Sequence, residues 1–246
     1  MAHDGVDATA ADAAREAGAM PDEAEVSLAF DGVTLYGSRE PVVRDVTFSL
    51  PRGEFGVLYG PTGGGKTTIL RLAHFDRRPD EGRVRACGYS SDTMTLDDVP
   101  AARRRIGMIF QDYKLLYDRP ALENVALALE LDGMPRRHVA RRAMELLGHV
   151  GLAAKRNALP ALMSGGEQQR LGIARALAFD PPVLLADEPT GNLDRAAAEE
   201  VMALLRRINH RGTAVLLATH DLHLVRGYRY PCWLVEQGRL TPSAPL

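Results

Sequence analysis

The chain has little cysteine and no long apolar run. Cys87 and Cys232 are its only cysteines, too few and too isolated for a disulfide framework or a metal site. No apolar stretch approaches the ~20 residues that span a bilayer. The N-terminus also lacks the basic and apolar regions of a secretory signal. We therefore expect a cytoplasmic protein in a reducing compartment, built as one domain with a lobe inserted in it.

Charge is distributed unevenly along the chain, whose formal net charge is −2. Residues 1–25 hold seven acidic side chains and one arginine, so the remainder of the chain is basic. Large apolar residues are nearly absent before Val26, and such a segment cannot bury enough surface to order itself. We predict a disordered acidic leader over 1–25, with either Met1 or Met20 as the translation start.

The most informative segment is rich in glycine. It fits the pattern G-x-x-x-x-G-K-[ST] and lies between an apolar strand-like run, 55–59, and a helix-forming run, 69–73. Its glycines let backbone N–H groups turn inward around phosphates, and the helix start adds its positive dipole end. Lys66 is expected to reach the β- and γ-phosphates, and the Thr67 hydroxyl to bind Mg²⁺. The predicted nucleoside triphosphate loop consists of Gly60, Pro61, Thr62, Gly63, Gly64, Gly65, Lys66, Thr67 and Thr68.

Hydrophobic periodicity predicts an α/β core with a helical insertion. The short, wholly apolar runs 183–186 and 214–218 are typical of parallel strands buried on both faces. Further strands are expected over 26–30, 46–50, 83–86 and 106–110, and helices over 121–131, 136–150, 165–178 and 196–208. The folded domain is predicted to span 26–246, with a helical subdomain inserted at about 112–163.

Polar side chains follow three of the expected core strands. Asp187 can hold Mg²⁺ through water, and the adjacent Glu188 can orient and polarise an attacking water. Gln111 can reach the metal and the water, and His220 can donate a hydrogen bond to the γ-phosphate. Open α/β sheets bind their ligands at the carboxyl ends of the strands. That shared location makes these four residues candidates for the catalytic and metal site.

A second glycine motif begins at Ser164 and precedes an expected helix. Ser164, Gly165, Gly166 and Glu167 form another cradle for an anion at the start of that helix. One nucleotide does not need two cradles that lie far apart in the sequence. We predict a homodimer in which each chain lends Ser164 and Gly166 to the nucleotide held by the other.

Taken together, these motifs resemble the ATP-binding cassette (ABC) ATPase family from Val26 onward. The glycine loop, Gln111, the 164–168 motif, the 187–188 pair, the 191–194 loop and His220 follow in the family's order. The resemblance implies a P-loop NTPase core with an antiparallel β subdomain and an inserted helical subdomain. It implies ATP and Mg²⁺ as cofactors, ATP hydrolysis, and a head-to-tail homodimer that ATP closes. It also implies that Tyr36 stacks on adenine and that Asp194 links the two sites of the dimer.

Within this family, residues 110–119 resemble the FtsE group of bacterial cell-division ATPases. Asp112, the pair 118–119 and residues 167–169 favour that group, whereas the run 184–194 is shared with lipoprotein-release and macrolide-efflux ATPases. The resemblance implies an FtsX-like membrane partner, a peripheral position on the cytoplasmic face of the bacterial membrane at the septum, and regulation of peptidoglycan hydrolysis. The alternative is the ATPase subunit of a lipoprotein-release or macrolide/peptide-efflux transporter.

Two surface features can each be interpreted either as structural or as a binding surface. Leu115, Leu116 and Tyr117 form an apolar patch that docks the membrane partner, seals the helical lobe onto the core, or does both. A basic cluster on one helical face is either a solvated surface or a contact with the membrane, and no nucleic-acid partner is expected. The cluster consists of Arg136, Arg137, His138, Arg141 and Arg142.

Overall fold

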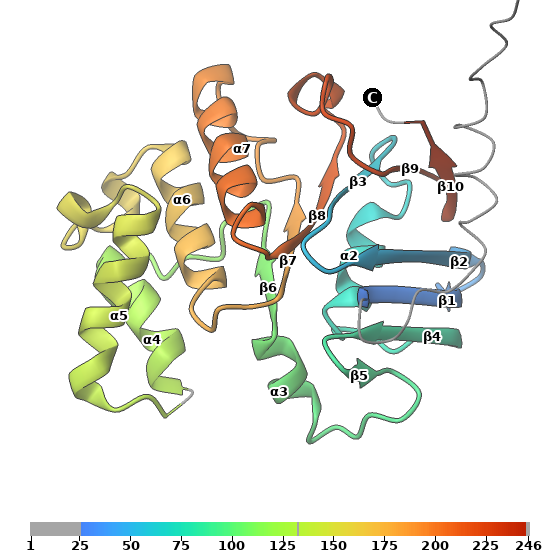
Figure 1. The fold of residues 1–246 in the computed structure, drawn as a ribbon, viewed down its shortest axis with the longest axis horizontal. Coiled ribbons are helices and arrows are strands. Elements are labelled where there is room, and N and C mark those ends of the chain that lie inside the picture. Colours follow the sequence, from blue (N-terminus) through green and yellow to red (C-terminus); the bar gives the residue numbers. More distant parts are fainter. Residues whose placement is uncertain (1–25, 132, 245–246) are drawn as a thin grey trace, which may run out of the picture.

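The computed structural model describes residues 26–131 and 133–244, so the leader predicted over 1–25 lies outside the described residues (Figure 1). Within those two ranges, no helix combines the length and the apolar character that crossing a bilayer requires.

A six-stranded, mostly parallel sheet forms the centre of the molecule, in the order β10-β9-β3-β8-β7-β6. β3 pairs in parallel with both β8 and β9, and β10 is antiparallel to β9 at the edge. Every residue of β7 and β8 is buried, as their wholly apolar runs predict. The strands are β3 (Phe55–Tyr59), β6 (Ile106–Ile109), β7 (Val183–Asp187), β8 (Ala214–Thr219), β9 (Cys232–Glu236) and β10 (Arg239–Ser243).

A second sheet is antiparallel and four-stranded, in the order β2-β1-β4-β5. Phe30 of β1 stacks on Phe48 of β2, and Phe48 in turn contacts Trp233 of β9, so the two sheets share one apolar core. This sheet is the antiparallel β subdomain that the family resemblance implies. Its strands are β1 (Val26–Tyr36), β2 (Pro41–Pro51), β4 (Glu81–Ala86) and β5 (Tyr89–Ser90).

Helices cover the core and form a lobe at one side of it (Figure 1). α4 packs against α5 and α6, while α6 also contacts β6 and α7, so α6 joins the lobe to the core. The helices are α2 (Lys66–Ala73), α3 (Val99–Arg104), α4 (Ala121–Leu131), α5 (Arg136–His149), α6 (Gly165–Ala176) and α7 (Arg195–Asn209). Short 3₁₀ turns are η1 (Ala153–Lys155), η2 (Pro160–Leu162) and η3 (Leu222–Leu224). The proposed subdomain limits of about 112 and 163 stay a prediction.

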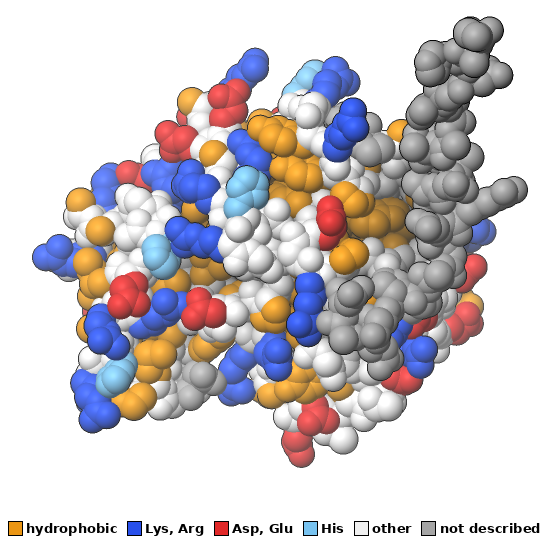
Figure 2. Space-filling model, viewed as in Figure 1, with side chains coloured by type: hydrophobic (Ala, Val, Ile, Leu, Met, Phe, Trp, Pro, Cys, Tyr) orange, Lys and Arg blue, Asp and Glu red, His pale blue; other side chains and the backbone are white. Residues whose placement is uncertain are grey.

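The lobe surface mixes charges of both signs (Figure 2). Arg142 of the basic cluster pairs with Asp180 at 2.5 Å and with Glu145 at 3.6 Å. Arg141 also approaches Glu145, at 3.9 Å. These pairs favour the interpretation of this helical face as a solvated surface.

Candidate active site

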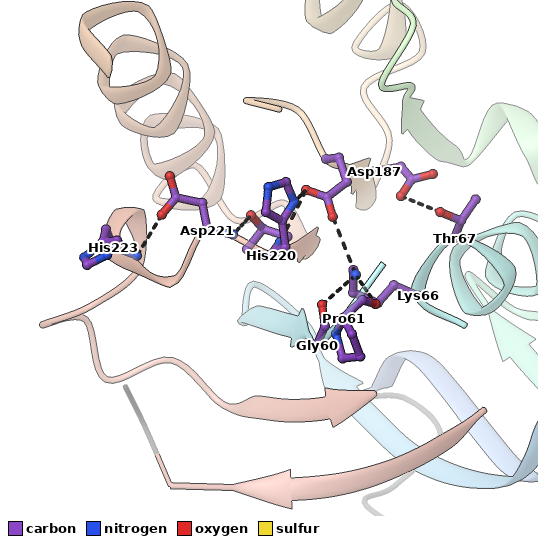
Figure 3. A network of polar contacts seen from close by, with 10 residues as sticks. Gly60, Pro61, Lys66, Thr67, Asp187, His220, Asp221 and His223 are labelled. Atoms are coloured by element: carbon purple, nitrogen blue, oxygen red, sulfur yellow. Dashed lines mark hydrogen bonds and ion pairs between the residues drawn. The ribbon is translucent and has the colours of Figure 1, made fainter. Parts of the chain in front are cut away.

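The predicted nucleoside triphosphate loop, residues 60–68, connects β3 to α2 and wraps around its own lysine (Figure 3). The Lys66 side chain is 5% exposed, and its ammonium donates to the carbonyls of Gly60 at 2.9 Å and Pro61 at 3.1 Å. The loop therefore curls around the lysine and holds it at its centre.

Strand β9 lies directly behind this loop, and its backbone leaves no room for a side chain at two of the loop's glycines. A Cβ atom on Gly60 would stand 2.2 Å from the carbonyl oxygen of Val235, and one on Gly64 would stand 2.5 Å from the same oxygen. Gly60 also has φ 144°, a conformation that L side chains rarely adopt. Gly238 follows β9 and donates its N–H to the Gly64 carbonyl at 2.9 Å. Sequence reasoning missed the contribution of Val235, because no motif marks a backbone carbonyl.

Thr67 and Asp187, two of the three predicted metal-site residues, meet at the carboxyl end of β7. The Thr67 hydroxyl donates to Oδ1 of Asp187 at 3.0 Å. Burial raises the pKa of Asp187, and the hydrogen bond from Thr67 opposes that rise. A hydroxyl and a carboxylate are the hard oxygen ligands that Mg²⁺ takes beside nucleotide phosphates, so these residues fit that ion.

Gln111 shares a cavity of about 500 Å³ with Thr67 and Asp187, at the end of β6. The side chain of Asn192 donates to the Gln111 carbonyl at 3.4 Å, so the segment after β6 touches the loop after β7. The structure thus brings the three predicted metal-site residues to one opening.

Glu188 is fixed at both of its carboxylate oxygens. Oε2 lies 2.8 Å from Nδ1 of His220, and Oε1 lies 3.6 Å from Nζ of Lys66. Glu188 has φ 45°, a left-handed conformation that costs a non-glycine residue on the order of 1 kcal/mol. Its backbone N–H donates to the Ala218 carbonyl at 2.9 Å, which helps to hold that conformation. The side chain is 11% exposed, while His220 is 56% exposed and can reach a ligand.

The second glycine motif forms a capped helix start on a different part of the molecule. Glu167 N–H donates to the Ser164 hydroxyl at 3.3 Å, and Ser164 N–H donates to the Glu167 carboxylate at 3.0 Å. The Lys155 ammonium, 2.7 Å from Glu167, holds the pKa of that carboxyl below its usual range. Gly165 and Gly166 follow in the first turn, and a Cβ on Gly166 would stand 3.0 Å from the Cβ of Ala197. Among the described residues, no hydrogen bond or ion pair joins Ser164 or Glu167 to the phosphate-type loop.

Asp194 and Tyr36 occupy surface positions next to these motifs. The Asp194 carboxylate caps α7 by accepting the Ala197 N–H at 2.9 Å. Tyr36 is 49% exposed, and its hydroxyl donates to Glu81 at 3.0 Å, an interaction that raises the pKa of Tyr36. Tyr36 pairs with Pro41 at the end of the β1–β2 hairpin. The next residue, Val42, lies against the nucleoside triphosphate loop, since its carbonyl oxygen would stand 3.3 Å from a Cβ on Gly65. Stacking of Tyr36 on adenine stays a prediction.

Asn124 of α4 organises the segment after Gln111, a role that sequence reasoning did not assign to it. Its side chain is 1% exposed, accepts the Leu116 N–H at 2.8 Å and donates to the Leu116 and Arg119 carbonyls at 2.9 Å each. A buried amide needs such partners. The available signal was an asparagine among apolar residues of a predicted helix.

The expected apolar patch is only partly exposed. Leu115 is 7% exposed and packs in the core shared by the lobe and the sheet, which agrees with the interpretation that the patch seals the lobe onto the core and removes Leu115 as a docking residue. Its inward direction follows from the loop that Asn124 fixes, which the sequence does not reveal. Leu116 is half-buried, and Tyr117 is 49% exposed with its hydroxyl donating to Gln168 at 3.1 Å.

Comparisons with known proteins agree with this site. The ABC transporter family model matches residues 43–191. FtsE, the cell division ATP-binding protein of Streptococcus pneumoniae strain D39, is 43% identical over 210 residues, covering 85% of this chain and 91% of that protein. The methionine import ATP-binding protein MetN 2 of Burkholderia mallei is 41% identical over 245 residues, covering 97% of this chain and 62% of that protein.

A solved structure extends the comparison to three dimensions. The dimer of the ATP-binding cassette MJ0796 in a post-hydrolysis state, bound to ADP and Pi, matches with a TM-score of 0.79 and 32% identity. The match covers 89% of this chain and 99% of that one. The architecture of two sheets and a helical lobe is therefore that of an ABC cassette, as expected. This chain belongs to the ABC transporter ATP-binding family and is an ABC-type ATPase, related to FtsE, that binds and hydrolyses ATP.

Proposed function

We propose that this chain is the ATPase subunit of an FtsEX-like complex in cell division. In that complex, ATP-driven closure of a head-to-tail homodimer regulates peptidoglycan hydrolysis through an FtsX-like membrane partner. The observation that carries the proposal is the match to FtsE, which spans 91% of that protein, whereas the match to MetN 2 spans 62% of its length. The exposed pair Asp118 and Arg119, which favours the FtsE group, follows the half-exposed Tyr117.

The proposed chemistry assigns one task to each site residue. Lys66 neutralises the terminal phosphates, and Thr67, Asp187 and Gln111 hold Mg²⁺, which supplies charge neutralisation on the phosphate oxygens. Glu188 orients and polarises the attacking water. His220 is already oriented by Glu188 and donates to the γ-phosphate.

A homodimer would complete the site. Ser164, Gly165 and Gly166 present a helix N-terminus, a ready-made site for anions, without contacting their own phosphate loop. The cassette MJ0796 is a dimer in its ADP-bound structure. Each chain would thus supply the 164–167 motif, and Asp194 beside it, to its partner's nucleotide.

The membrane partner would dock beside Gln111, where nucleotide chemistry and partner motion can be linked. Tyr117 offers an exposed aromatic ring there, and Leu116 adds a half-buried apolar side chain. We place the complex on the cytoplasmic face of the bacterial membrane at the division septum, with this chain as its peripheral subunit.

A second candidate is the ATPase subunit of a transporter that carries a substrate. The match to MetN 2, a methionine import ATP-binding protein, favours it because it covers 97% of this chain. Every active-site assignment is the same in both candidates. The lipoprotein-release and efflux transporters expected from the sequence fall within this class.

The test is co-purification from native membranes with the Glu188→Gln variant and ATP, which would trap the closed dimer. Recovery of an FtsX-like permease is the expected result, and recovery of a transporter permease would instead support the second candidate. Lys66→Ala is the matched control, since it removes nucleotide binding while leaving Leu116 and Tyr117 in place. Trapped dimer that recovers no membrane protein would contradict both candidates.

A further inference from the structure

A cavity of about 470 Å³ lies at the end of the central sheet that is opposite to the candidate active site. Its wall includes Pro182 and Gly212, which come just before the amino ends of β7 and β8. Arg52 and Arg105 line the same cavity, and none of its described lining residues is acidic. The cavity is therefore a basic site that lies apart from the nucleotide chemistry.

The two arginines of this cavity have no acidic partner among residues 26–131 and 133–244. Both are exposed. Burial raises the pKa of the Cys87 thiol, and the positive charges of Arg105 and Arg52 oppose that rise, so both guanidinium groups lie near this one side chain. Arg103, by contrast, pairs with Asp76 at 3.2 Å. The cavity thus brings together two positive charges that no described carboxylate neutralises.

The acidic leader joins the fold at this cavity. Val26, the first described residue, lines it, and Asp22, Glu23 and Glu25 directly precede Val26 in the sequence. β1 is antiparallel to β2, with Val26 opposite Pro51. Continuing that register by one residue would set position 25, which is acidic, opposite position 52, which is basic. Opposite charges that face each other across antiparallel strands attract, so charge and register favour the same occupant.

We propose that residues 22–25 of the acidic leader bind in this cavity, with their carboxylates on Arg52 and Arg105. Residue 22 lies four positions before Val26, so an extended chain places it within about 14 Å of that residue. Attachment to β1 also makes the encounter intramolecular, and a short tether gives an effective concentration of order mM. Weak, partly exposed ion pairs can therefore form there without help from a second chain.

The contact joins the leader to both sheets. Arg52 lies in the turn from β2 to β3, and Arg105 lies between α3 and β6. A leader bound to both arginines links the start of β1 to two turns of the central sheet and stabilises their junction. Residues 1–21 take no part in the contact, so it forms whether Met1 or Met20 is the translation start. It requires neither a nucleotide nor a membrane partner.

The first test neutralises each side of the contact and then both. The triple variant Asp22→Asn/Glu23→Gln/Glu25→Gln should melt about 2–4 °C lower at low salt, as expected for the loss of a few partly exposed ion pairs in a chain of this size. Arg52→Gln/Arg105→Gln should give a similar loss. Combining the two sets should add little, because each already removes the same contact. The losses should shrink in about 1 M NaCl, where such pairs are screened.

The matched control neutralises three acidic residues far from Val26, in the variant Asp4→Asn/Asp7→Asn/Asp12→Asn. It makes the same change in net charge and should melt like the parent. A leader variant that melts like this control would overturn the proposal. Losses that add fully when the two sets are combined would overturn it as well.

The second test detects the contact directly and does not depend on stability. Arg105→Lys keeps the positive charge and supplies an amine, which a carbodiimide joins to an adjacent carboxylate as an amide with loss of water. Mass spectrometry should find position 105 linked to residues 22–25 within one chain, and the link should disappear in the Asp22→Asn/Glu23→Gln/Glu25→Gln background. A link from position 105 to a second chain, or no link to residues 22–25, would overturn the proposal.

Discussion

The Glu188 carboxylate accepts twice from His220, at 2.8 Å from ring Nδ1 and at 3.3 Å from the backbone N–H. Both contacts use Oε2, so Oε1 remains directed toward Lys66 at 3.6 Å. These contacts with two elements of the protein fix the orientation of the carboxylate. Such preorganisation is what a group that must aim a water molecule needs.

Removing the His220 imidazole should slow hydrolysis while sparing ATP binding. We expect His220→Ala to lower the phosphate-release rate about 10²-fold or more, within the range that positioned proton-handling groups contribute. His223→Ala is the neighbouring control, since His223 donates to Asp221 through its backbone N–H, which the substitution keeps. A His220→Ala protein that turns over at the parental rate would remove His220 from the proposed site.

Neutralising Asp187 should stabilise the nucleotide-free fold. Burial raises the pKa of Asp187, so its folded-state pKa exceeds the unfolded value and its ionisation at neutral pH opposes folding. Asp187→Asn should raise the melting temperature at pH 7.5, by about 2–4 °C for each kcal/mol relieved. The difference should shrink as the pH falls through the raised pKa of Asp187, and it should vanish below the unfolded-state pKa of ~3.9, where the carboxyl is protonated in both states.

The same variant should lose any Mg²⁺-dependent gain in melting temperature with ATP. The melting temperature without nucleotide reports the effect on the fold, and the gain with Mg²⁺ and ATP reports the metal role. An Asp187→Asn protein less stable than the parent at neutral pH would contradict the expected stabilisation. An intact Mg²⁺-dependent gain would contradict the metal role.

Leu115 and Tyr117 should behave in opposite ways when truncated. Leu115→Ala empties a packed core position and should lower the free energy of unfolding by about 2–5 kcal/mol. Tyr117→Ala should cost about 1 kcal/mol or less, because its ring is half-exposed, yet it should weaken recovery of the membrane partner. Thermal melts and co-purification of the Leu115→Ala and Tyr117→Ala proteins distinguish core packing from partner docking. Partner recovery that survives Tyr117→Ala would move the docking site elsewhere.

Cys87 should resist alkylation in the native protein. Burial raises the pKa of its thiol to about 11, and the Sγ atom donates to the Arg105 carbonyl at 3.3 Å. At pH 8 the thiolate fraction is about 10⁻³, against about a quarter for a free cysteine of pKa ~8.5. Iodoacetamide labelling followed by mass spectrometry should be slower than in unfolded protein by about 10² or more. Labelling at the unfolded rate would show that the thiol is ionised or exposed.

The sequence predicted those parts of the fold that depend on local signals. Helix α4 has the predicted bounds 121–131, and α6 begins at Gly165 because Ser164 and Glu167 form a capping box. Strands β9 and β10 were not predicted. Both are short, and β10 contains Pro242, which only an edge strand tolerates.

The contacts that complete the site could not be predicted, because they join distant segments. Lys66 and Glu188 are separated by more than a hundred residues, and the motifs suggested their proximity only through a shared sheet edge. Nothing local indicates that Arg175 binds the carbonyls after Gln111, or which side chain of the 115–117 patch points inward. Those directions depend on backbone conformations at Tyr113 and on the hydrogen bonds of Asn124.

The carbonyl of Val235 behind Gly60 has a consequence for the order of biosynthesis. Ribosomes make the chain from its N-terminus, and folding can begin before synthesis ends. The glycine loop emerges early, but its backing strand is translated some 170 residues later. Until then β3 lacks one neighbour, and the loop lacks the surface that shapes it. A nascent chain should therefore leave the ribosome unable to retain ATP, and acquire that ability only once residues 231–238 have joined the sheet.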